Sequence, residues 1–85
     1  IKATRARLAA ELERTGFRVP ASEANFVLAR RPGVDLGPVA RALAARDILV
    51  RHFAVPGLED ALRITVGTDA EVDALLAALR DVARP

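Results

Sequence analysis

Arg63 is the residue of this sequence whose position is best suited to binding an anion. It lies in a short run in which Leu62, Ile64 and Val66 are aliphatic and alternate with Arg63 and Thr65. On a pleated strand the three aliphatic side chains share one face and the arginine points to the other. A guanidinium is planar and permanently charged, and it binds carboxylate or phosphate through two parallel hydrogen bonds. Most arginines on the outer face of a strand are solvated or structural, so the pattern alone assigns no ligand.

Other residues that could carry chemistry are isolated. His52 is the single histidine, and no acid is placed to orient it, so we expect it not to act as a catalytic base. Lys2 is the only lysine and lies at the start of an expected helix. The chain has no cysteine, which excludes disulfides and thiolate metal sites, and one histidine does not make a metal site. We therefore expect neither catalytic residues nor a metal site in this chain.

Composition limits the class of protein. Eighty-five residues, 52% of them hydrophobic, make one small folded domain, and no run approaches the ~20 apolar residues of a membrane span. The net charge is +2 with three aromatic residues, and acids and bases are interleaved, so the sequence does not indicate nucleic-acid binding. No signal peptide is visible, which predicts a cytoplasmic protein. Because helical periodicity is under way at Ile1, which is not methionine, we expect a fragment of a longer polypeptide.

Hydrophobic periodicity and turn residues predict the elements around these side chains. Gly16 suits a left-handed helix end, Asp35 suits a helix N-cap, and Thr68 with Glu71 has the spacing of a capping box. The expected order is helix, short strand, strand, helix, strand, strand and helix, at residues 1–15, 17–19, 24–31, 36–46, 48–53, 62–66 and 69–83. This order predicts an α+β fold, with a small mixed or antiparallel sheet of three to four strands and helices packed on one side.

Residues 24–31 form the most strand-like run, dense in phenylalanine, valine and leucine. Nearly continuous apolarity is typical of a strand that is covered on both faces, so we predict that this strand is central. The adjacent Arg30 and Arg31 are most simply interpreted as its solvated end.

Three runs resemble the C-terminal small domain of the histidinol-phosphate aminotransferases, which are fold-type I pyridoxal-phosphate enzymes of class I/II. They are S-E-A-N-F-V-L at 22–28, D-I-L-V-R-H-F at 47–53 and L-R-I-T-V-G-T at 62–68. The resemblance covers essentially the whole chain, so residues 1–85 are expected to form that domain. Asp47 stands where such proteins usually carry glycine at a helix end, and aspartate tolerates the left-handed conformation less well.

The resemblance also implies roles for individual residues. Arg63 corresponds to the arginine that binds the substrate α-carboxylate, and Arg51 to an arginine that faces the phosphate side of the pocket. Arginines on adjacent strands could clamp both ends of a phosphate ester and hold it for reaction. Asn25 could support an arginine by a hydrogen bond, although an asparagine before a strand more often bonds to local backbone.

The chemistry itself is expected outside this chain. Amino transfer needs pyridoxal phosphate, a lysine that forms a Schiff base with it and an acid beside its pyridinium nitrogen. The resemblance places these in the large domain of the full-length parent, so the isolated chain should bind no cofactor and have no activity. The implied partners are that large domain, an amino-acid or keto-acid substrate with glutamate or 2-oxoglutarate, and a second copy of the parent in a homodimer. The implied process is histidine biosynthesis in the cytoplasm.

Alternatives remain open. A related aromatic aminotransferase or a threonine-phosphate decarboxylase shares much of the pattern. A stand-alone ferredoxin-like binding or regulatory module is an alternative of another class, but the aromatic pair or glycine-rich loop typical of one is not visible. A purely structural oligomerisation module is a third possibility.

Overall fold

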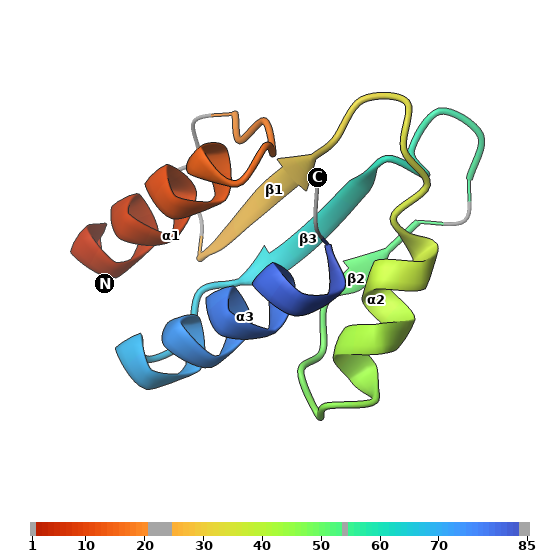
Figure 1. Cartoon of the computed structure of the whole chain (residues 1–85). Coiled ribbons are helices and arrows are strands. Elements are labelled where there is room, and N and C mark those ends of the chain that lie inside the picture. The colour runs from red at the N-terminus through yellow and green to blue at the C-terminus, as the bar shows by residue number, and fades with distance from the viewer. Residues whose placement is uncertain (1, 21–24, 54, 84–85) are drawn as a thin grey trace.

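Helices cover one face of a small antiparallel sheet in the part of the chain that the computed structural model describes, residues 2–20, 25–53 and 55–83 (Figure 1). Along the chain the elements are α1 (Lys2–Arg14), β1 (Phe26–Arg30), α2 (Gly37–Ala44), β2 (Arg51–His52), β3 (Ala61–Thr65) and α3 (Asp69–Val82). Helix α3 contacts both α1 and α2. The predicted α+β class, with an antiparallel sheet and helices on one side, is confirmed. No helix in the described ranges is long and apolar enough to cross a membrane.

Strand β3 is the middle strand, and the sheet order is β1-β3-β2. Strand β1 pairs with it from Phe26↔Thr65 to Arg30↔Ala61, and β2 pairs through Arg51↔Arg63 and His52↔Leu62, both antiparallel. The prediction that residues 24–31 form the central strand is therefore wrong. On the outer side of β1 the described residues form a single bridge, between Arg18 and Arg30.

The two faces of β1 explain this error. Val27 and Ala29 are buried under the helices, whereas Phe26 and Leu28 are half-buried on the other side of the sheet. The run looks continuously apolar because both faces carry apolar side chains, although the helices cover only one. We call the other side the open face. The strand register places on it Phe26, Leu28, Arg30, Arg51, Arg63, Thr65 and the buried Ala61.

The core lies between the sheet and the helices. As predicted, Leu62 and Ile64 point into it and Arg63 points out. All three helices contribute leucines to one continuous cluster with the covered face of the sheet, among them Leu8, Leu12, Leu43, Leu75, Leu76 and Leu79. Burial of these leucines fixes which face of the sheet the arginines occupy.

Two predicted strands are shorter than expected. The 17–19 segment makes only the bridge at Arg18, and the 48–53 segment is a strand only at Arg51–His52. Residues 48–50 follow Asp47, whose φ of 60° is left-handed, and they remain unpaired until β2 begins at Arg51. Leu49 is 82% exposed as a result. This leucine, part of the apolar run that predicted a strand, therefore belongs neither to the core nor to a paired strand.

Helices α1 and α2 end in the same way. After α1 the Phe17 N–H donates to the Leu12 carbonyl at 3.1 Å, and after α2 the Ile48 N–H donates to the Leu43 carbonyl at 2.9 Å. These are the long bonds of a Schellman motif, which needs a left-handed residue just before the donor. Gly16, with φ 97°, supplies it in the first case, as predicted, and Asp47 supplies it in the second.

The start of α3 confirms the predicted capping box. The Thr68 hydroxyl accepts from the Glu71 N–H at 3.1 Å, and the Glu71 carboxylate accepts from the Thr68 N–H at 2.8 Å. Asp35 accepts from the Gly37 N–H at 2.8 Å, although Leu36 is the residue that precedes α2. The capping box therefore fixes the turn that joins β3 to α3.

Arg31 fastens the ends of two helices. Its guanidinium donates to the Thr15 carbonyl after α1 at 2.7 Å and to the Ala83 carbonyl after α3 at 3.0 Å, and it lies 4.3 Å from the centroid of the Phe17 ring. A cation beside two helix C-termini is favourable, because their terminal carbonyls lack partners within the helix. The interpretation of Arg30 and Arg31 as a solvated strand end is wrong for Arg31.

Candidate anion-binding site

Arg51 and Arg63 lie next to each other on the open face. They are Cα partners in the pairing of β2 with β3, and both are exposed. Residues directly opposite each other in an antiparallel pair project from the same face. The two arginines predicted to bind anions are therefore brought together, on the side of the sheet that the helices leave uncovered.

Aromatic rings, rather than carboxylates, accompany these guanidinium groups. Arg63 Cζ lies 5.1 Å from the centroid of Phe26, and Arg51 Cζ lies 5.7 Å from the centroid of Phe53. No carboxylate among the described residues forms an ion pair with either arginine. By contrast, Arg30 on the same face is paired with Asp60 at 2.8 Å. The donors of Arg51 and Arg63 are thus available to an anion from outside this part of the chain.

The end of the loop that precedes β3 is held in place by hydrogen bonds and an ion pair at Glu59 and Asp60. The Asp60 carboxylate forms an ion pair with Arg30. The main-chain carbonyl of Asp60 accepts a hydrogen bond from the Arg31 N–H at 3.0 Å. The Glu59 carbonyl accepts from the Leu36 N–H at 2.9 Å. These bonds fix the start of β3, two residues before Arg63.

His52 fixes β2 from the helix side of the sheet. Its Nε2 lies 3.0 Å from the Glu59 carbonyl oxygen and 3.3 Å from Asp35 Oδ1. The expectation that no acid is placed beside His52 is therefore wrong. Both oxygens are acceptors, so we assign the proton to Nε2. Because side chains alternate along a strand, His52 points away from the face that carries Arg51. It connects β2, the loop and the start of α2, which is a structural role.

Asn25 adjoins this site through its main chain. Its carbonyl accepts from the Val66 N–H at 2.8 Å, which extends the pairing of β1 with β3 by one step. Within the described ranges its side chain makes no hydrogen bond to Arg51 or Arg63. The structure therefore brings the two arginines together and leaves Asn25 at the end of the ladder.

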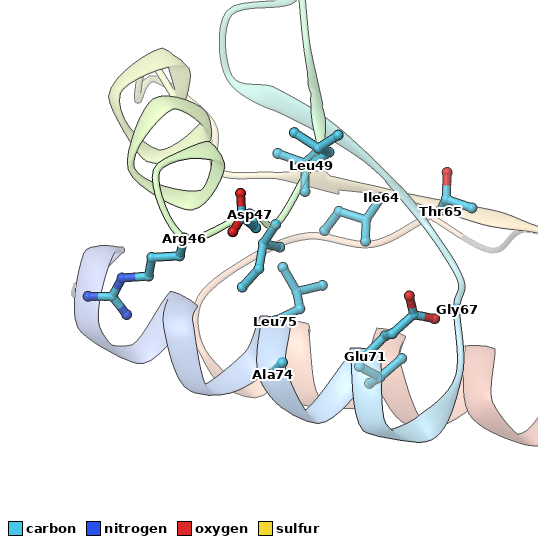
Figure 2. A pocket seen from close by; sticks show the side chains of 12 residues that line it. Arg46, Asp47, Leu49, Ile64, Thr65, Gly67, Glu71, Ala74 and Leu75 are labelled. Carbon is cyan, nitrogen blue, oxygen red and sulfur yellow. The ribbon is translucent and has the colours of Figure 1, made fainter.

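A cavity of about 600 Å³ lies elsewhere, between residues 46–50, the end of β3 and α3. Figure 2 shows Ile64 and Leu75 lining it from the sheet and from α3. Residues 48–50, which line it, precede β2 and are not paired in the sheet. Neither Arg51 nor Arg63 lines it, so this cavity and the paired arginines are separate features.

No set of side chains for a metal or for pyridoxal phosphate is found in the part of the chain that the structure describes. No group of three histidine, cysteine or acidic residues could hold a metal ion there. Lys2 is exposed in the first turn of α1, which packs on the covered side of the sheet, away from Arg63. The chain's one lysine thus lies on the other side of the sheet from Arg63, and the groups that the open face presents are guanidinium groups, whose chemistry suits anions.

Sequence reasoning missed Phe26 and Phe53 as partners of the arginines. The sequence signal is an aromatic residue with the same strand parity as the arginine. For Phe26 and Arg63, which belong to different strands, the register of β1 with β3 must be known before one can say that they share a face.

Comparisons with known proteins agree on one family. Residues 1–79 match the family described as aminotransferase class I and II. Histidinol-phosphate aminotransferase 2 of Burkholderia lata is 52% identical over 79 residues, which are 93% of this chain and 22% of that protein. Histidinol-phosphate aminotransferase 2 of Rhizobium meliloti is 54% identical over 82 residues, 96% of this chain and 23% of that protein.

Solved structures give the same result. The histidinol-phosphate aminotransferase from Clostridium acetobutylicum matches with a TM-score of 0.83 and 31% identity, over 96% of this chain and 26% of that one. The enzyme from Sinorhizobium meliloti in complex with pyridoxal-5′-phosphate matches with a TM-score of 0.77 and 31% identity, over 95% and 23%. The present chain thus spans about a quarter of the length of the proteins that it matches.

Proposed function

Because the chain belongs to the aminotransferase class I and II family, we propose that it is the C-terminal small domain of a pyridoxal-phosphate aminotransferase and binds the anionic groups of the substrates. The observation that carries this proposal is the pair Arg51 and Arg63. They lie side by side on the open face, and no carboxylate of the described residues is paired with either.

Each arginine takes one anionic group in this proposal. Arg63, on the middle strand, binds the substrate α-carboxylate, and Arg51, on β2, binds the phosphate. Two fixed guanidinium groups recognise a planar carboxylate and a phosphate with defined geometry, which a single point charge does not do. Holding the anions in place also orients the reacting carbon, and orientation accounts for a large part of catalytic rate enhancement.

The substrates follow from the relatives. Several of them are named histidinol-phosphate aminotransferases, so we propose a role in histidine biosynthesis, with a phosphate-bearing amine as one substrate and glutamate or 2-oxoglutarate as the other. A related aromatic aminotransferase or threonine-phosphate decarboxylase is the alternative within the family. The match over residues 1–79 to an enzyme family favours this function over a stand-alone ferredoxin-like module.

The remaining parts of the enzyme lie outside this chain in the proposal. Pyridoxal phosphate, when bound, supplies the carbonyl group and the electron sink that amino transfer requires. Its lysine and the acid beside its ring nitrogen belong to a large domain of the same cytoplasmic polypeptide, which acts as a homodimer. This chain contributes positioning through its arginines.

Steady-state kinetics of the full-length protein tests the assignment. Arg63→Ala should lower kcat/KM for glutamate and 2-oxoglutarate by about 3 kcal/mol, because a desolvated charge pair loses one partner. Arg51→Ala should act mainly on the phosphate-bearing substrate. Arg18→Ala, which removes an exposed arginine from the outer side of β1, is the matched control. Unchanged kinetics in Arg63→Ala would refute the carboxylate role.

A further inference from the structure

Phe26 contacts Arg63 diagonally across the open face. Phe26 is the first residue of β1 and pairs with Thr65, and Arg63 pairs with Leu28. Phe26 and Arg63 are therefore diagonal neighbours on one face of the sheet. Arg63 Cζ lies 5.1 Å from the Phe26 centroid, within the distance at which a ring attracts a cation. The guanidinium therefore leans from β3 toward β1.

The charges around Arg63 favour the same direction. On its other side Arg51 is its Cα partner and carries a charge of the same sign, which repels it. Leu28 is the Cα partner on β1, but an aliphatic side chain offers no attraction to a cation beyond packing. Two rings adjoin the arginine pair: Phe53 lies beside Arg51, whereas Phe26 is the ring that contacts Arg63. The negative face of Phe26 therefore attracts the Arg63 guanidinium toward β1.

A ring holds an arginine without consuming its hydrogen-bond capacity. A carboxylate in place of Phe26 would neutralise the cation and occupy its donors, as Asp60 does with Arg30 at 2.8 Å. The ring accepts no conventional hydrogen bond, so it leaves the N–H donors of Arg63 to an incoming carboxylate. An arginine held in this way is preorganised, and less conformational entropy is lost when the ligand binds.

We infer that Phe26 is a positioning residue, whose ring holds the Arg63 guanidinium in the orientation that binds the substrate carboxylate. This inference rests on the proposed function of Arg63. The ring acts on the ligand only through Arg63, so its contribution should disappear when Arg63 is absent.

Binding of glutarate, a dicarboxylate that cannot react, tests the inference by isothermal titration calorimetry on the full-length protein. Phe26→Leu should raise the Kd about 2- to 5-fold, the range expected for one exposed cation–π contact. Phe26→Tyr keeps the ring and should restore the original Kd. Phe26→Met, whose flexible side chain adapts to the same space, should repeat the effect of leucine and guards against a folding defect peculiar to that variant.

The same substitutions in an Arg63→Ala background separate positioning from a structural role. There Phe26→Leu should leave the Kd unchanged, whereas a structural role of the ring would weaken binding in both backgrounds. An unchanged Kd for both Phe26→Leu and Phe26→Met with Arg63 present, or an equal loss in the two backgrounds, would overturn the inference. If Arg63→Ala alone leaves the glutarate Kd unchanged, the proposed function of Arg63 fails as well.

Discussion

Arg51 and Arg63 are direct Cα partners across β2 and β3, with both guanidinium groups exposed on the same face. Like charges directly opposite each other destabilise an antiparallel pair. Strand β2 contributes only two residues to the ladder, so few other contacts offset this repulsion. Anionic groups bound to the two arginines would offset this repulsion, and the pair is therefore easier to explain by ligand binding than by stability.

We predict that Arg51→Thr stabilises this chain in the absence of ligand. Removal of the repulsion should raise the free energy of unfolding by about 0.5 kcal/mol, measured by urea denaturation at low ionic strength. Arg18→Thr is a suitable control, because Arg18 also faces an arginine, Arg30, which is already neutralised by Asp60. Equal effects of the two substitutions would contradict the prediction.

Loss of the Arg31 side chain should be the most destabilising arginine substitution among those considered. Arg31→Leu keeps an apolar stem over Phe17 but removes both bonds to helix-end carbonyls, and we expect a loss of about 3 kcal/mol in the free energy of unfolding. Arg30→Leu removes a partly exposed ion pair and should cost about 1 kcal/mol or less. The comparison in urea fails if the two losses are alike.

Asp47→Gly should stabilise the chain. Asp47 holds φ 60° in the motif that ends α2, a conformation that costs L-amino acids about 1 kcal/mol and costs glycine nothing. We expect a gain of about 0.5 kcal/mol once the greater freedom of glycine in the unfolded chain is included. Asp47→Ala should give a loss instead, and a gain from alanine would show that the conformation is not the cause.

The free energy of unfolding should decrease in acid, because Asp69 becomes protonated. Its hydrogen bonds from Arg7 and then Thr4 lower the pKa of Asp69 below the usual value. A carboxyl group with a lowered folded pKa contributes stability above its unfolded pKa of about 4, and this contribution is lost as the pH falls through the folded pKa. Thermal unfolding of wild type and Asp69→Asn should therefore differ at pH 6 and converge near pH 2. Parallel pH profiles would exclude Asp69 as the cause.

Local sequence signals predicted the helices and their ends well, because those signals act over a few residues. The Thr68 and Glu71 capping box, the left-handed Gly16 and the outward direction of Arg63 depend only on neighbouring residues. The order of strands in the sheet is a long-range property. Phe26 and Leu28 made β1 look doubly covered, and only the register shows that they lie on the open face.

Part of the candidate site could be predicted from the sequence, namely the part that does not depend on strand pairing. Family resemblance selected Arg51 and Arg63, and alternation gave the face of Arg63. Their adjacency required the pairing of β2 with β3, and the role of Phe26 required the pairing of β1 with β3. Arg31 was misread because a sequence does not show that two helix ends converge on one side chain.

The bonds of Arg31 also affect how the fold opens. Because one guanidinium joins the end of α1 to the end of α3, fraying of either helix breaks a contact that the other helix uses. The first and last helices should therefore exchange their amide hydrogens as a single cooperative unit, rather than by independent local opening.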